Sequence, residues 1–271
     1  MPKLTSYQGL RAVVTGASSG LGRLFALRVA TGGARVALVA RRESELARVA
    51  DAVRQAGGEA LVVPCDVADR AAVADAAARV TAAFGGVDLL LNNAGYGGHR
   101  TFLDWDVDDI ERMMRVNFLG TVYWTKALLP AMVAQRRGWL VFMASVAGKF
   151  GVPDESVYAA TKFAMVGLAE AITSEVEDDG VHVLTVCPGS IRTDFFDAAT
   201  LERMPPVARR SMIEPEPVID AMLAALARSK HEITVPARIA AAYLVRAVAP
   251  EFLRRSTKRL TIDAIRKGAG R

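Results

Sequence analysis

The chain has 271 residues, of which 52% are hydrophobic and 23% are charged. This length and composition fit one compact α/β domain with a large core and exclude an intrinsically disordered chain. No stretch approaches the roughly 18 apolar residues of a membrane-spanning helix, and no secretory signal is visible, so a cytoplasmic protein is expected. Cys65 and Cys187 follow no metal-binding or redox spacing, and the three histidines are scattered, so no metal site is expected.

The formal net charge of +5 is concentrated at the C-terminal end of the sequence. Residues 251–271 contain seven Lys and Arg residues against two acidic residues, whereas the preceding residues carry equal numbers of both signs. A basic surface spread over the whole domain is the usual footprint of nucleic-acid binding. Its absence argues against a nucleic-acid partner.

Short apolar runs alternate with amphipathic helical stretches along the first 236 residues, in the pattern of buried strands joined by crossover helices. Strands are expected at residues 10–15, 35–40, 60–64, 87–91, 139–144, 181–187 and 232–235. Helices are expected at residues 21–30, 43–55, 70–84, 108–135, 156–177 and 217–228. The order predicts an α/β fold with a doubly wound, Rossmann-type parallel sheet of about seven strands and helices on both faces.

Two segments fall outside this alternation. Residues 194–216 are rich in proline and follow the sixth strand, at the sheet edge where ligands bind, so they are a candidate lid loop within a domain spanning residues 1–236. Residues 237–271 form a basic amphipathic helical extension. Such a segment can lie on an anionic membrane surface, dock on a neighbouring subunit, or cover its own domain.

A glycine-rich turn joins the first strand to the first helix. Gly16 allows a tight turn, Gly20 leaves room for a pyrophosphate, and Gly22 permits close packing of the helix on the strand. The helix N-terminus then presents free N–H groups and a positive dipole end to phosphate. The turn therefore predicts a dinucleotide site, although an ordinary glycine turn would have the same composition.

A second group of residues predicts proton-transfer chemistry. Tyr158 and Lys162 are four residues apart on one helix face, and Ser145 ends the fifth strand. A tyrosine hydroxyl titrates near 10, and a neighbouring cation lowers that value toward a useful range. We therefore expect Tyr158 to move a proton to or from a substrate oxygen that Ser145 holds.

The glycine spacing and the Ser145, Tyr158 and Lys162 set resemble the short-chain dehydrogenase/reductase family, over about residues 9–193. The resemblance implies that Asn117, Ser145, Tyr158 and Lys162 are catalytic, with Asn117 bending its helix and holding a water. It also implies a set of residues that contact a nicotinamide cofactor. These are Gly16, Ser18, Ser19, Gly20, Leu21, Gly22, Arg41, Arg42, Asp66, Val67, Asn93, Ala94, Gly95, Tyr158, Lys162, Pro188, Gly189, Ile191 and Thr193.

The end of the second strand indicates which cofactor is bound. NAD-binding proteins place a carboxylate there for the ribose hydroxyls, and an arginine there instead pairs with the 2′-phosphate of NADP. This chain has Arg41 and Arg42 and no acidic residue before Glu43. Two guanidinium groups can hold a phosphate bidentately, so NADP is expected and NAD is less favoured. A solvated arginine pair at a helix start is the alternative.

These observations favour an NADP-dependent oxidoreductase that interconverts a ketone or aldehyde and an alcohol on a small, hydrophobic molecule. A ketoacyl thioester reductase and a non-catalytic NADP-binding sensor or scaffold are the alternatives. The family resemblance also implies a homodimer or homotetramer. Phe163, Val166 and Ile172 are then expected to lie partly at a subunit contact.

Overall fold

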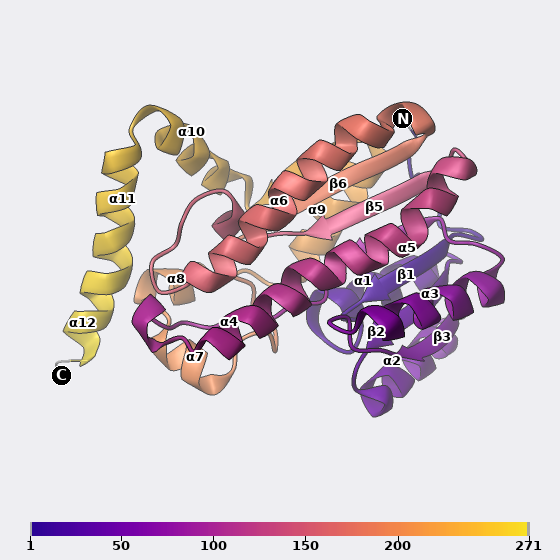
Figure 1. The fold of residues 1–271 in the computed structure, drawn as a ribbon, viewed down its shortest axis with the longest axis horizontal. Helices are drawn as coiled ribbons and strands as arrows, with labels where there is room; N and C mark the ends of the chain where they lie inside the picture. Colours follow the sequence, from indigo (N-terminus) through magenta and orange to yellow (C-terminus); the bar gives the residue numbers. More distant parts are fainter. Residues whose placement is uncertain (1, 270–271) are drawn as a thin grey trace.

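The computed structural model describes residues 2–269 and contains one seven-stranded sheet with helices on both faces (Figure 1). All strand pairs are parallel, in the order β3-β2-β1-β4-β5-β6-β7. The strands are β1 (Arg11–Thr15), β2 (Arg35–Ala40), β3 (Glu59–Pro64), β4 (Leu89–Asn92), β5 (Gly138–Met143), β6 (Val181–Pro188) and β7 (Glu232–Val235). This is the predicted doubly wound sheet, and the strand order reverses between β1 and β4, where such folds bind ligands.

The strands form because their near-continuous apolar runs can be buried on both faces of a parallel sheet. All eight residues of β6 and all six residues of β5 are buried. One face of the sheet packs against α1 (Gly20–Thr31), α2 (Glu43–Gln55) and α9 (Glu216–Ala227). The other face packs against α3 (Arg70–Phe84), α5 (Gly120–Ala134) and α6 (Ser156–Val176). The two hydrophobic layers hold the carboxyl ends of the strands in fixed positions.

Two predicted segments differ in detail from the structure. The single long helix expected at residues 108–135 is divided into α4 (Val107–Met114) and α5 by a π-helical turn, η2 (Arg115–Leu119). The lid is not an irregular loop, because it contains the short helices α7 (Ala198–Arg203) and α8 (Pro206–Arg210). Pro206 opens α8 at its first position, where the missing N–H costs nothing.

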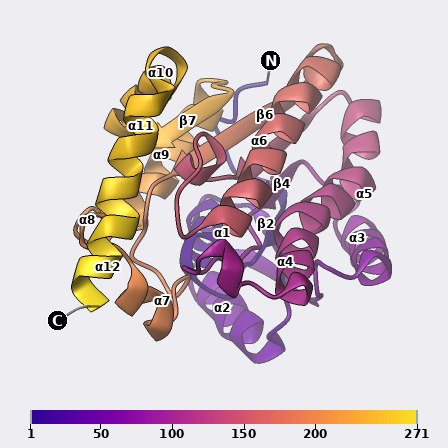
Figure 2. The ribbon, with the colours of Figure 1, turned by 60° about the vertical axis from the view of Figure 1, so that its left-hand side comes forward.

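The C-terminal extension is helical, as expected, and forms an arm at one end of the molecule (Figure 1). It consists of α10 (Ala241–Val248), α11 (Pro250–Lys258), the π-helical turn η6 (Arg259–Asp263) and α12 (Ala264–Ala269). In Figure 2 this arm lies beside the lid helices α7 and α8. The half of the sheet that contains β2 and β3, with α2 and α3, is at the opposite end.

The expected subunit contact through Phe163, Val166 and Ile172 stays a prediction, because the structure contains one chain. Val166 and Ile172 point into the hydrophobic layer under the sheet, where each is 8% exposed. The Arg246 guanidinium from α10 lies over the Phe163 ring, 5.0 Å from its centroid. Val166 and Ile172 are therefore covered within one chain, whereas Phe163 is partly exposed.

Candidate active site

The glycine turn between β1 and α1 has the geometry of a phosphate cradle. Gly16 and Gly20 have φ angles of 67° and 53°, which L-residues with a side chain rarely adopt. A Cβ atom on Gly22 would lie 2.3 Å from the Gly16 carbonyl oxygen, so this position closes the turn against the helix. Ser19 precedes α1, and no side chain caps that helix end. Its first N–H groups therefore remain available for an anionic ligand.

Thr15 ties this turn to the neighbouring strand β4. Its hydroxyl donates to the Leu91 carbonyl (3.1 Å) and accepts from the backbone N–H groups of Asn93 (2.9 Å) and Ala94 (3.0 Å). The Asn93 amide returns a hydrogen bond to the Thr15 carbonyl (2.9 Å). The carboxyl ends of β1 and β4 are therefore held together by side-chain hydrogen bonds as well as by the sheet.

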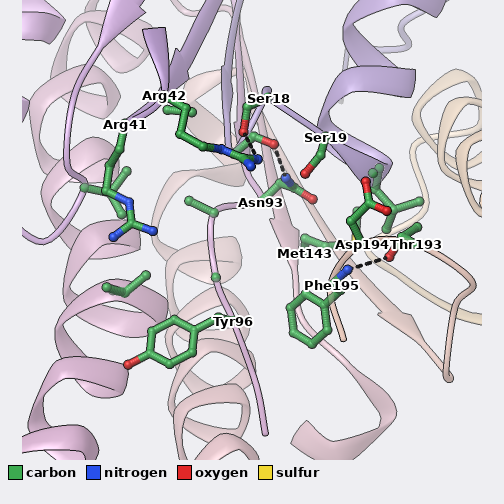
Figure 3. Close-up of a pocket in the computed structure, with 18 of the residues that line it drawn as sticks. Ser18, Ser19, Arg41, Arg42, Asn93, Tyr96, Met143, Thr193, Asp194 and Phe195 are labelled. Carbon is green, nitrogen blue, oxygen red and sulfur yellow. Dashed lines mark hydrogen bonds between the residues drawn. The ribbon is translucent and has the colours of Figure 1, made fainter. Parts of the chain in front are cut away.

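A cleft of about 540 Å³ opens along this edge of the sheet (Figure 3). All the residues predicted to contact a cofactor line this cleft except Gly22, Tyr158 and Pro188. Gly22 lies beneath the turn, and Pro188 ends β6 beside the cleft residue Gly189. Asp194, Phe195 and Phe196, at the start of the predicted lid, and Tyr96 also line the cleft. The residues that sequence reasoning missed are Ala40, Cys65, Arg112, Val116 and Met143.

Arg41 and Arg42 enter the cleft from the side opposite Thr193, Asp194 and Phe195 (Figure 3). The Arg42 guanidinium donates to the Ser18 hydroxyl at 3.2 Å, so it reaches back over the glycine turn. Arg41 and Arg42 directly follow β2. In sequence order, the first acidic residue that lines the cleft is Asp66, which comes after β3. This side of the cleft is therefore cationic, which suits a phosphate group.

Asn117 lies in the π-helical turn η2 and is fully buried. Its amide donates to the Tyr96 carbonyl (2.8 Å), and its Oδ1 accepts from the Tyr96 N–H (3.0 Å). The same side-chain NH₂ group also donates to the Thr161 hydroxyl on α6 at 3.2 Å. π-Helical turns inside α-helices are rare and are frequent at functional sites. Asn117 thus joins the loop after β4 to the helix that carries Tyr158 and Lys162.

Gly95 provides the space between Asn117 and Lys162. A Cβ atom at this position would lie 3.1 Å from Asn117 Oδ1 and 3.8 Å from Lys162 Nζ. The Lys162 ammonium donates to the Met143 carbonyl at 2.7 Å and is almost completely buried. The structure therefore brings together the four predicted catalytic residues Asn117, Ser145, Tyr158 and Lys162 at the carboxyl ends of β4 and β5.

The expected lowering of the Tyr158 pKa does not hold for the protein alone. Desolvation of the phenol, together with the negative charge of Glu155, raises the Tyr158 pKa well above its usual value, while a hydrogen bond with Ser145 opposes this effect. The Lys162 Nζ lies over the Tyr158 ring, 5.6 Å from its centroid, and donates to a backbone carbonyl. Desolvation also lowers the pKa of Lys162 from 10.5 to about 8.

A phenylalanine from the start of the lid covers Tyr158. The Phe195 and Tyr158 rings meet edge to face, with 5.9 Å between their centroids. A Cβ atom on Gly97 would touch both rings, at 3.1 Å from Phe195 and 3.2 Å from Tyr158. This packing explains why Tyr158 itself does not line the cleft, although Phe195 does.

An ion pair fixes the lid to the segment that precedes α6. Arg203, at the end of α7, donates from Nε to Asp154 Oδ2 (3.0 Å) and from Nη2 to Asp154 Oδ1 (2.8 Å). The Asp154 carboxylate is fully buried, and the His99 ring lies 3.5 Å from it. Burial by itself raises the Asp154 pKa, but contacts with His99 and Arg203 outweigh it and hold that pKa below its usual value.

Comparison with known proteins places the chain in a family. The family model described as short chain dehydrogenase matches residues 11–203. A ketoacyl reductase, HetN, from Nostoc sp. is 33% identical over 232 residues, which cover 86% of this chain and 80% of that protein. The chain therefore belongs to the short-chain dehydrogenase/reductase family, whose members are oxidoreductases.

A second relative is the bovine dehydrogenase/reductase SDR family member 7B. It is 39% identical over 189 residues, or 68% of this chain, and the matched part spans 58% of that longer protein. A relative described as an uncharacterized oxidoreductase from Staphylococcus aureus is 35% identical over 83% of this chain and 95% of its own length.

Solved structures agree with this assignment. A short-chain dehydrogenase/reductase from Burkholderia phymatum in complex with NAD superposes with a TM-score of 0.82 and 30% identity, covering 92% of this chain and 96% of that one. A metagenomic short-chain oxidoreductase in complex with NADP gives a TM-score of 0.73 and 32% identity, covering 85% and 97%. The two neighbours carry different cofactors, so the fold leaves the choice between NAD and NADP to the residues of the cleft.

Proposed function

We propose that this protein is an NADP(H)-dependent oxidoreductase that interconverts a hydrophobic ketone or aldehyde and the corresponding alcohol. The observation that carries the proposal is the cationic wall of the cleft, where Arg41 and Arg42 follow β2 and Arg42 contacts Ser18. The glycine turn fits a pyrophosphate, because Gly16 and Gly20 have positive φ angles and side chains there would fill the space. Arg41 and Arg42 would hold the 2′-phosphate.

The bound cofactor supplies or accepts the hydride. The chain supplies the proton and holds the substrate oxygen. Tyr158 donates the proton from its hydroxyl, and the Ser145 side chain lies near enough to lower the Tyr158 pKa. A raised pKa keeps Tyr158 protonated before reaction, which suits a proton donor in the direction of carbonyl reduction. Lys162 places a positive charge next to the Tyr158 ring, and this charge stabilises the tyrosinate that forms after the proton leaves.

The proposed substrate is hydrophobic because part of the cleft lining is apolar. Tyr96, Val116, Met143, Phe195 and Phe196 belong to this part. Aromatic and aliphatic side chains of this kind favour an apolar ligand with one polar group to be oriented. Phe195 also packs against the Tyr158 ring.

A ketoacyl thioester reductase is the second candidate, and the 33% identity to the ketoacyl reductase HetN favours it. A non-catalytic NADP-binding protein is less well supported. Such a protein has no chemical need for Asn117, Ser145, Tyr158 and Lys162 in one group.

The test is NADPH oxidation, followed by absorbance, with a panel of aliphatic ketones of increasing chain length, aromatic ketones, aldehydes and 3-ketoacyl thioesters. The proposal predicts turnover with the apolar ketones or aldehydes and a KM that falls with apolar size. Turnover confined to the thioesters supports the second candidate. NADPH binding without turnover of any compound in the panel would contradict both enzymatic proposals.

A further inference from the structure

The large hydrophobic side chains exposed on this protein are confined to three segments. Among residues 2–269 there are eight of them, and all belong to residues 102–107, the lid, or the C-terminal arm. They are Phe102, Leu103, Val107, Val207, Leu244, Val248, Phe252 and Leu260. In both views the lid helices α7 and α8 lie near the arm (Figures 1 and 2). An exposed apolar surface of this kind marks an interaction site.

The arm combines these apolar side chains with the excess positive charge. Leu244 and Val248 are four residues apart on α10, so they share one face, and they are 67% and 74% exposed. On α11, Leu253 and Thr257 are partly buried, whereas Phe252 and Arg255 are exposed, as is Arg259 at the start of η6. Phe252 is 66% exposed and lies three residues before Arg255. The outward side of the arm is therefore apolar and basic at the same time.

The charges favour an anionic partner. Residues 251–271 carry seven basic and two acidic residues, which equals the net charge of +5 of the whole chain. Glu251 is already paired with Arg254 (2.6 Å) and Arg255 (2.9 Å). No salt bridge joins Lys258, Arg259 or Arg266 to a carboxylate among the residues that the structure describes. These three cations remain available for anions outside the chain.

We propose that this end of the protein docks on a bilayer that contains anionic lipids. Leu244, Val248 and Phe252 enter the interface, and Lys258, Arg259 and Arg266 meet the headgroups. Residues 2–269 contain no helix that is both long and apolar enough to cross a membrane, so the docking is to the surface. The lid helices α7 and α8 lie beside the arm (Figure 2), so docking through the arm would bring the lid close to the bilayer.

A second copy of the chain fits this surface less well. A symmetric dimer through the arm would place the same basic segment of each subunit against the other. Two segments that each carry +5 repel one another, whereas the same charges attract an anionic surface. Nucleic acid would use the cations but would leave Leu244, Val248 and Phe252 exposed.

The test is co-sedimentation of the full-length protein with phosphatidylcholine vesicles and with vesicles that contain about a third phosphatidylglycerol, at about 0.1 M and about 0.5 M salt. The wild type is expected to bind the anionic vesicles at low salt and to bind pure phosphatidylcholine far less. Binding measures no turnover, so its result is independent of the proposed reaction. Wild-type protein that stays in the supernatant with both kinds of vesicle would overturn the proposal.

Three variants separate the contributions to binding. The triple substitution Leu244→Ser, Val248→Ser, Phe252→Ser removes the apolar contacts, and Lys258→Gln, Arg259→Gln, Arg266→Gln removes three charges. Each is expected to weaken binding, the second by about a hundredfold, since each basic residue near an anionic surface contributes about a factor of five. The matched control, Arg79→Gln, Lys126→Gln, Arg228→Gln, removes three exposed charges elsewhere on the domain and is expected to bind as the wild type does.

Two controls keep the result interpretable. Melting temperature and NADPH binding establish that each variant is folded, because neither the arm nor the control positions line the cleft. Light scattering measures the mass of each variant in solution. If the arm variants change the oligomeric mass, or if the control loses as much vesicle binding as they do, the assignment of this surface to lipid is wrong.

Discussion

The Arg203 guanidinium of the lid and the buried Asp154 carboxylate connect the lid directly to the helix that carries the predicted catalytic residues. The two hydrogen bonds measure 3.0 and 2.8 Å, and Asp154 is four residues before Tyr158. The Asp154 backbone has a φ angle of 70°, and its carbonyl accepts a hydrogen bond from Arg100 N–H at 2.8 Å. The lid is therefore bound to a carboxylate whose backbone is itself held by the hydrogen bond from Arg100.

Arg203→Met should loosen the lid and destabilise the fold. It leaves the Asp154 carboxylate buried without its bidentate partner, and we expect a loss of about 2 kcal/mol, between the values for exposed and buried pairs. Urea unfolding measures this loss. Arg28→Met, which removes an ion pair with both partners exposed, is the control and should cost less. If the two variants lose the same free energy of unfolding, the Arg203–Asp154 pair is no stronger than an exposed ion pair.

The buried Lys162 should give the stability of the protein a defined pH dependence. Its pKa is about 8 in the folded protein against 10.5 when solvated, so the unfolded chain binds more protons between these values. Stability due to this group therefore rises with pH from about 8 to 10.5, by up to about 3 kcal/mol. We expect the difference in unfolding free energy between wild type and Lys162→Met to grow in favour of the wild type from pH 7.5 to about pH 10. A difference that stays constant would show that Lys162 titrates normally.

Arg41→Asp should change the choice of cofactor. It replaces an attraction to the 2′-phosphate of NADPH with a repulsion, and we expect NADPH affinity to fall by about tenfold to a hundredfold while NADH affinity changes little. Fluorescence titration with both cofactors measures the change. Arg48→Asp, on the exposed side of α2 and outside the cleft, controls for the general effect of charge. A wild type that binds NADH more tightly than NADPH would contradict the assignment of Arg41.

Much of the fold could be predicted from the sequence, because each strand of a buried parallel sheet requires a continuous apolar run. The runs at residues 35–40 and 181–187 leave few other structures that can bury them. The cofactor cleft could also be predicted, since Gly16, Gly20 and Gly22 follow a strand and open a helix. In these segments the conformation that the local sequence favours is also the one that the whole fold needs.

The lid contact could not be predicted in this way. Asp154 and Arg203 are 49 residues apart, and neither belongs to a periodic pattern. The position of Phe195 over Tyr158 likewise depends on how the lid folds back over the site. The direction of the Tyr158 pKa was predicted wrongly, because spacing shows that Lys162 is near but does not show the desolvation around the hydroxyl. Burial at an active site is a property of the assembled structure.

The most direct test of the central claim, that Tyr158 is the proton donor of an NADP-dependent oxidoreductase, is the rate of NADPH oxidation by wild type and Tyr158→Phe with one substrate found in the panel. Only a hydroxyl is removed, so NADPH affinity and melting temperature should be retained, while kcat falls by about a hundredfold to ten-thousandfold. Tyr7→Phe removes a hydroxyl outside the cleft and should keep the wild-type rate. A Tyr158→Phe protein that turns over at a rate close to that of the wild type would contradict the account.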